Sequence, residues 1–208
     1  MELLKPKINI MNTLKKFKTM KKTIVLVGPH GAGKTTIGKM LSKIYKWHFD
    51  YEIGKKLRAE IIDINPDYHA MLEQDNFDKK VLSLEKIRDI ENSRNRIVET
   101  WHPGNCAYAM LRSRKVAKSI YEDVKDHLNK YDGNIIIQPI VINRNTILKR
   151  LNESGPNKND LSEFFLRVYE KTISIAAKLK LKVLEPINTN NTSISNTVDR
   201  VIYNLENY

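Results

Sequence analysis

Runs of apolar residues alternate with amphipathic stretches along the chain. Thr23–Val27 reads TIVLV, a continuous β-branched and apolar run that is typical of a strand buried on both faces of a parallel sheet. From Lys34 onward, Ile37, Leu41 and Ile44 recur at helical spacing, which predicts a helix packed on that strand. The first predicted unit is therefore a strand, a loop and a helix.

The same alternation continues to the end of the chain. Further strands are expected at 47–51, 96–100, 135–142 and 182–184. Helices are expected at 53–64, 75–93, 106–111, 115–129, 143–151, 161–179 and 193–205. Pro139 lies inside one predicted strand and indicates that pairing is interrupted there. Strands that alternate with helices predict right-handed crossovers, and hence an α/β fold with three α/β/α layers and a mainly parallel sheet.

Length and composition favour one ordinary globular domain. A chain of 208 residues is long enough for one well-buried α/β core, and 41% hydrophobic with 29% charged residues is a usual balance. No run of about 18 apolar residues could span a bilayer, so no membrane partner is expected. The single Cys106 excludes an internal disulfide and fits a reducing compartment, so we expect a cytoplasmic protein.

Half of the positive charge lies at the N-terminus. Residues 1–22 hold seven lysines against Glu2, which is 7 − 1 = +6 of the net charge of +12. We expect residues 1–21 to form a basic, disordered arm and 22–208 to form the domain. The remaining charge is modest for a protein that holds polyphosphates, so nucleic acid is compatible with the composition but is not required to explain it.

The loop after the first strand carries the most specific motif. It reads Gly28, Pro29, His30, Gly31, Ala32, Gly33, Lys34, Thr35 and fits G-x-x-x-x-G-K-[ST], the Walker A pattern, between a strand and a helix. Its glycines let successive amide hydrogens point at phosphate oxygens, and the helix adds its positive end. This context predicts a P-loop NTPase fold that binds a nucleoside triphosphate.

Three side chains at the end of this loop have separate expected roles. Lys34 bridges the outer phosphates, Thr35 is a ligand of the Mg²⁺ that neutralises them, and Thr36 adds a contact nearer the α-phosphate. His30 is more consistent with a loop filler than with a catalyst. The expected cofactors are a nucleoside triphosphate and Mg²⁺.

Two carboxylates are expected beside the phosphate loop. Glu99 ends the apolar run after Arg96, and Glu52 follows the second predicted strand. Because strand ends of an open parallel sheet line one crevice, either can hold Mg²⁺ through water or accept the proton of an attacking hydroxyl. Spacing does not choose between these roles. His102 is predicted either to contact phosphate or to be a core residue.

At this point the sequence resembles the nucleotide and nucleoside kinases among P-loop proteins, thymidylate kinases and deoxynucleoside kinases in particular. Four segments carry the resemblance: GPHGAGKTT, FDYEIGKKLR, IVETWHPGN and INRNTILKRLNESG. The resemblance covers roughly residues 22–206, and the phosphate loop is its most specific part. It implies transfer of the γ-phosphoryl group of ATP to a nucleotide or nucleoside.

The resemblance also implies roles for individual residues. Glu99 takes the position of the acidic residue in the Asp/Glu-Arg motif, and Glu52 that of the carboxylate after the second strand. Arg58 and Arg112 then steady an acceptor phosphate. Homodimers are common in the resembled group.

This sequence departs from the group at two places. Thr100, not arginine, follows Glu99, so a basic role passes to His102 or to another residue. The predicted lid, 153–160, offers only Lys158, where related lids offer several arginines to the transferring group. Arg150 before the loop and Arg167 after it are the candidate substitutes.

Two other functions remain open from the residues. A P-loop ATPase or nucleotide-binding protein without a small acceptor needs an acidic pair after its strand, whereas RIVET has one acid. A kinase of polynucleotide 5′-hydroxyl groups needs the same chemistry and draws on the basic arm. A GTP switch is disfavoured because NKND at 157–160 does not follow an apolar strand.

Overall fold

The computed structural model describes residues 21–65, 71, 75–91, 94–151 and 158–208. The predicted basic arm falls outside this part of the chain except for Lys21, and residues 153–157 of the predicted lid lie outside it too. Lys158 already begins a helix, so the predicted loop ends earlier than expected.

The strands are β1 (Lys22–Val27), β2 (His48–Asp50), β3 (Arg96–Glu99), β4 (Asn134–Val141), β5 (Lys182–Val183) and β6 (Ile187–Asn188). The helices are α2 (Lys34–Tyr45), α3 (Ile53–Ile62), α4 (Asp75–Glu91), α5 (Trp101–Arg112), α6 (Arg114–Asn129), α7 (Arg144–Arg150), α8 (Lys158–Lys178) and α9 (Ile194–Glu206). The strands form one sheet in the order β2-β3-β1-β4-β5, with β6 also paired to β4, and each described pairing is parallel.

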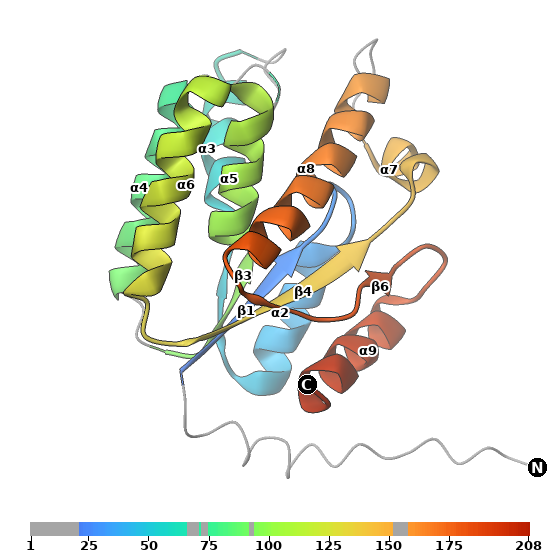
Figure 1. Ribbon diagram of the computed structural model, residues 1–208. Helices are drawn as coiled ribbons and strands as arrows, with labels where there is room; N and C mark the ends of the chain where they lie inside the picture. Colours follow the sequence, from blue (N-terminus) through green and yellow to red (C-terminus); the bar gives the residue numbers. More distant parts are fainter. Residues whose placement is uncertain (1–20, 66–70, 72–74, 92–93, 152–157) are drawn as a thin grey trace, which may run out of the picture.

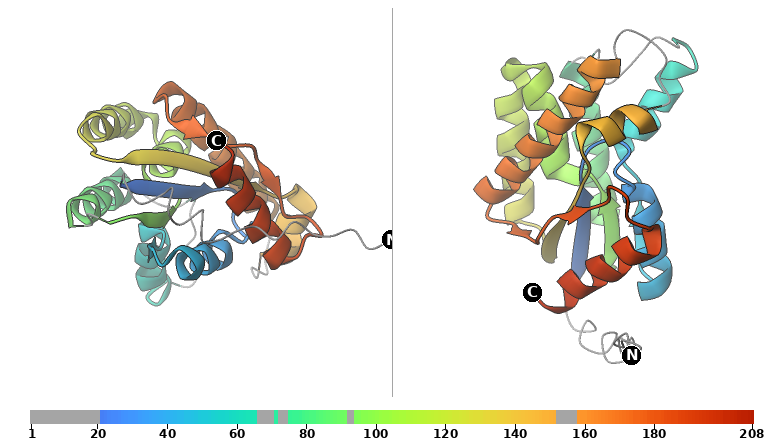
Figure 2. Two further views of the ribbon diagram at one scale, coloured as in Figure 1. Left: turned by 90° about the horizontal axis from the view of Figure 1, so that it is seen from below. Right: turned by 90° about the vertical axis from the view of Figure 1, so that its right-hand side faces the viewer.

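Helices cover both faces of this sheet, as Figures 1 and 2 show. Alternate residues of β1 belong to two buried clusters: Ile24 and Leu26 lie in the larger one, which contains residues of α2 and α9 and also of α5, α6 and α8. Val25 and Val27 pack with Trp101 of α5 and with residues of α8. The predicted three-layer α/β/α P-loop fold with a mainly parallel sheet is therefore confirmed.

Two local predictions need correction. Helix α5 begins at Trp101 and not near residue 106, because Pro103 lies in the first turn, where its missing N–H costs nothing. Pro139 does not interrupt β4, since it still lies opposite Val27 of β1. On its other edge β4 pairs first with β5 at Ile136 and Ile137, then with β6 from Ile140, so Pro139 lies between the two neighbours.

No helix within the described residues is both long and apolar enough to cross a membrane.

The central strands are the part of the core most sensitive to lost volume. Ile97 in β3 is completely buried, whereas Ile90 in α4 is 80% exposed. We expect Ile97→Ala to lower the free energy of unfolding by about 2–5 kcal/mol through lost burial and the cavity left behind. Ile90→Ala, the matched control, changes it by about 0.5 kcal/mol or less. Urea unfolding measures both, and equal effects would contradict this core.

Candidate active site

The phosphate loop leaves β1 in a backbone conformation that only its glycines allow. Gly31 and Gly33 have φ of 76° and 91°, a left-handed region that side chains rarely adopt. A Cβ on Gly28 would lie 2.0 Å from the carbonyl oxygen of Ile140, because the loop starts in direct contact with β4. The curled loop then leads into α2 at Lys34, with the open helix N-terminus facing the crevice.

Two basic side chains hold the loop in place. The Lys34 ammonium is nearly buried and donates to the carbonyl oxygens of Gly28 at 2.9 Å and Pro29 at 3.0 Å. Arg150, at the end of α7, donates through Nη1 to the Gly31 oxygen at 2.7 Å. The structure therefore brings Arg150 to the phosphate loop.

His30 lies at the rim of the site with its ring stacked on Phe165 of α8, 5.0 Å between centroids and 23° between planes. Enclosure of the ring against its neighbours, reinforced by the Lys34 charge, lowers the pKa of His30 to about 4. The ring is therefore neutral at neutral pH, and its flat contact with Phe165 forms an aromatic wall.

Thr35 and Glu99 meet directly across the loop. The Thr35 hydroxyl lies 3.0 Å from Oε1 and 2.9 Å from Oε2 of Glu99, to which it donates. Oxygen ligands of Mg²⁺ at about 2.1 Å in an octahedron are about 3 Å apart along each edge, so these oxygens fit adjacent positions around that ion. The residues predicted as metal ligands thus form a donor set suited to Mg²⁺.

Glu52 lies at the start of α3 and is held from two sides. Arg58, one turn and a half further along α3, donates to Oε1 at 2.6 Å, and Thr100 donates to Oε2 at 3.0 Å. Glu52 and Glu99 both line one cavity of about 410 Å³ together with residues of the phosphate loop. The predicted meeting of strand ends therefore brings both carboxylates to the same cavity.

The two carboxylates have opposite pKa shifts. Burial raises the pKa of Glu99, and the negative charge of Glu52 reinforces this shift while Lys34 opposes it. Burial also acts upward on the pKa of Glu52, but Arg58 and Lys34 outweigh it and lower that pKa below its ordinary value. Pairs of titratable groups driven apart in this way are characteristic of sites with acid–base chemistry.

The rest of the cavity is lined by residues that the sequence did not single out, together with Thr36 of the predicted loop. They come from α3, α5 and α8: Lys55, Ala59, Ile62, Tyr108, Leu161 and Phe165. The helical periodicity of these segments predicts only which face of each helix is buried. Which of those faces would meet at the cavity depends on tertiary packing.

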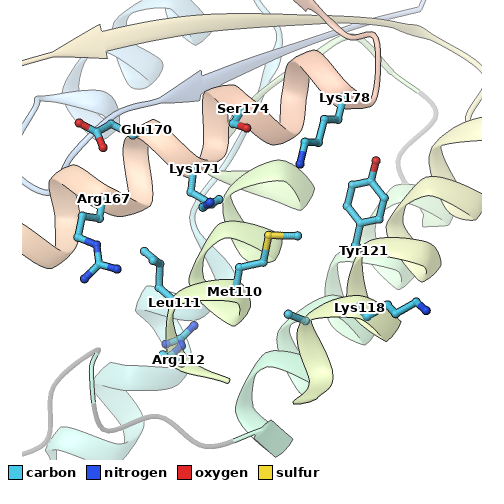
Figure 3. Close-up of a pocket in the computed structure, with 11 residues that line it drawn as sticks. Met110, Leu111, Arg112, Lys118, Tyr121, Arg167, Glu170, Lys171, Ser174 and Lys178 are labelled. Carbon is cyan, nitrogen blue, oxygen red and sulfur yellow. The ribbon is translucent and has the colours of Figure 1, made fainter. Parts of the chain in front are cut away.

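Arg112 and Arg167 line a different groove. Figure 3 shows it between α8 and the pair α5–α6, and its volume is about 1060 Å³. Arg112 pairs with Asp78 there, and its guanidinium lies 4.9 Å from the Tyr108 ring. Neither arginine lines the cavity over the phosphate loop, so the structure does not join them to Glu52 and Glu99.

His102 lies away from the phosphate loop and does not line the cavity over it. The His102 ring is completely buried and lies 2.7 Å from Asp89, so of its two predicted settings the structure shows the core one. Lys158 is the first residue of α8, and its side chain lies outside the described part of the structure.

No family model matches the chain. A shikimate kinase from Wigglesworthia glossinidia brevipalpis is 27% identical over 165 residues, which cover 76% of this chain and 91% of that protein. This relative was not part of the resemblance seen in the sequence.

Solved structures of two other kinases have a similar fold. A deoxyadenosine kinase from M. mycoides with bound dCTP matches with a TM-score of 0.60 and 14% identity, covering 89% of this chain and 100% of that one. A thymidylate kinase from Ehrlichia chaffeensis matches with a TM-score of 0.56 and 17% identity, covering 89% and 99%. The predicted resemblance to nucleotide and nucleoside kinases is thereby confirmed at the level of the fold.

Glu99 is expected to reduce the stability of the ligand-free protein. Its raised pKa means that the unfolded chain releases this proton at lower pH than the folded protein, so this group's contribution falls as pH rises above about 4.5. We expect Glu99→Gln to be more stable than the wild type by about 0.5–2 kcal/mol at pH 8, with a smaller difference at pH 4.5.

Thermal unfolding at the two pH values measures this difference. Glu163→Gln, an exposed glutamate of α8, is the matched control and should not change the pH dependence. A Glu99→Gln protein that is destabilised equally at both pH values would contradict the assigned cause.

Proposed function

We propose that this protein is a phosphotransferase that moves the γ-phosphoryl group of Mg-ATP to a nucleoside or nucleotide. The observation that carries this proposal is the convergence of Lys34, Thr35, Glu99 and Glu52 on one cavity at the carboxyl ends of the parallel strands. Fold similarity to deoxyadenosine and thymidylate kinases supports the reaction class.

The residues of the loop bind and orient the donor. Backbone amides from Gly28 to Thr36 and the N-terminus of α2 surround its phosphates, and Lys34 adds a positive charge. Thr35 and Glu99 would hold Mg²⁺, which when bound neutralises charge on the phosphates. Arg150, which donates to the Gly31 oxygen of the loop, would add a further positive charge.

Glu52 is the residue best suited to orient the acceptor. Its lowered pKa keeps it ionised, so it can accept a hydrogen bond from an acceptor hydroxyl and orient that hydroxyl. Arg58 and Thr100 fix the carboxylate from two sides. Positioning of this kind is the main contribution that a protein makes to phosphoryl transfer.

The walls of the cavity favour a flat, aromatic acceptor. His30 and Phe165 present stacked rings, and Ile62 and Leu161 add apolar surface beside them. A nucleobase can stack on such a wall, and Lys55, which lines the same cavity, can offer a positive charge to an acceptor phosphate or carboxylate. A shikimate-like hydroxy acid is the second candidate because of the sequence similarity to a shikimate kinase.

Phosphate transfer from labelled ATP tests the proposal directly. The acceptor panel contains nucleosides, nucleoside monophosphates, shikimate and a 5′-hydroxyl oligonucleotide, each with and without Mg²⁺. We expect transfer to a nucleoside or nucleotide, and a loss of about 10²–10³-fold in kcat for Lys34→Ala, which removes a charge from the reacting phosphates.

Lys43→Ala is the matched control, since Lys43 is exposed on the same helix. It should transfer phosphate at the wild-type rate. Phosphate released only to water would replace the proposal with an ATPase, and transfer to shikimate alone would replace the acceptor class.

A further inference from the structure

The backbone directly after Glu99 adopts a strained conformation. Thr100 has φ of 71° and ψ of −68°, the geometry of a γ-turn with positive φ, and Trp101 has φ of 54°. Such angles cost about 1–3 kcal/mol per residue and are rare for a β-branched residue such as threonine. They persist only where surrounding contacts impose them.

The strained turn at Thr100 and Trp101, called the Thr100 corner below, contacts both carboxylates of the site. The Thr100 amide donates to the Leu26 oxygen of β1 at 3.0 Å, and its hydroxyl donates to Glu52. Glu99, the preceding residue, accepts from Thr35. A change in the Thr100 dihedral angles would therefore move the contacts of Glu52 and Glu99 together.

Gly104 provides the space that the corner needs. A Cβ at this position of α5 would lie 2.4 Å from Cγ2 of Thr100, so only glycine lets the threonine methyl group pack there. Space alone does not select the strained angles, however. Attachments further along α5 are needed to hold them.

Those attachments converge on Asp89 of α4. The Trp101 indole donates through Nε1 to Oδ1 at 3.1 Å, and Nε2 of His102 lies 2.7 Å from Oδ2. Arg96 and His127 bond to the same carboxylate, His127 at 2.7 Å from Oδ2. Asp89 thus holds the two residues that immediately follow Thr100.

The groups around Asp89 keep its carboxylate ionised and therefore able to accept several hydrogen bonds. Burial acts upward on its pKa, but the bonds from His102 and His127 and the Arg96 charge outweigh it and keep the carboxylate ionised. Burial lowers the pKa of His102, so its ring is neutral and can donate from Nε2. Asp89, His102 and His127 are close enough for a metal ion, within 4.8 Å, but Arg96 on the same carboxylate opposes a cation there.

We propose that Asp89 is a positioning residue for the phosphate site. Its hydrogen bonds to Trp101 and His102 hold the backbone of the Thr100 corner, and this corner determines the positions of the Glu99 and Glu52 carboxylates. Asp89 lines neither described cavity, so it acts only through these neighbours. The inference rests on the proposed function for its effect on catalysis, and on the geometry alone for its effect on the corner.

Hydrogen exchange in the nucleotide-free protein tests the corner without any acceptor. Asp89→Asn keeps the volume but can accept from one side only, so it loses either the Trp101 bond or the histidine bonds. Trp101→Phe keeps an aromatic ring but loses the N–H and part of the buried volume. We expect both variants to exchange the amides of 97–104 at least tenfold faster than the wild type.

Glu91→Gln is the matched control on the same helix. Glu91 is an exposed acid of α4 and is not one of the four described side chains that bond to Asp89. It should leave exchange at 97–104 unchanged. Exchange that is unchanged in both test variants, or equally raised across the chain in all three, would overturn the proposal.

Magnesium dependence and kinetics then test the link to the site. With Asp89→Asn, ATP binding in EDTA should match the wild type, because the loop is intact, while the gain from Mg²⁺ and kcat fall about 10- to 100-fold. A wild type that binds Mg-ATP but transfers phosphate to no acceptor defeats the proposed function and leaves the exchange result standing. If Asp89→Asn does not fold, Trp101→Phe decides: wild-type exchange and Mg²⁺ dependence in that variant overturn the inference.

Discussion

The parallel pairing of β1 with β3 is the constraint on which the site depends. Its register sets Leu26 opposite Glu99, so the phosphate loop and the carboxylate leave neighbouring strands at the same height. The Thr100 amide extends this pairing by one further bond to Leu26. A shift of one residue would turn Glu99 to the other face of the sheet and separate it from Thr35.

Burial of charge around that edge gives the site its chemical character. Glu52 and Glu99 are both buried, and the Lys34 charge acts on both of them while Arg58 acts on Glu52. The carboxylate nearer to Arg58 is the easier one to ionise. The same fold that stabilises the core therefore produces two acids of unequal strength within a single cavity.

The sequence was most informative where chemistry is local. The phosphate loop could be predicted because its glycines, lysine and threonine must stand at fixed spacing between a strand and a helix. Glu99 and Glu52 followed from the rule that the ends of parallel strands meet at one edge. Strands β1 to β5 followed from apolar runs nearly at their observed bounds, whereas the two-residue β6 was not predicted.

Contacts between distant helices could not be predicted in this way. Asp89 is an unremarkable acid in the amphipathic pattern of α4, and its role depends on packing against Trp101 and His102 of α5. The sequence shows that Arg112 is basic but not which acid it pairs with. The orientation of its helix turns it toward Asp78 and not toward Glu52. The effect of Pro139 was predicted wrongly because β4 changes its partner from β5 to β6 at this residue. That change depends on other segments and cannot be seen in the sequence of β4 itself.

Hydrogen bonds from side chains of the protein hold the backbone of the phosphate loop. Lys34 rests on two carbonyl oxygens of its own loop, and Arg150 ties a third from α7. These hydrogen bonds fix the loop backbone from within the protein, so a phosphate that binds there does not have to select it from other backbone conformations. Little conformational entropy is lost on association, which is the thermodynamic meaning of a preorganised receptor.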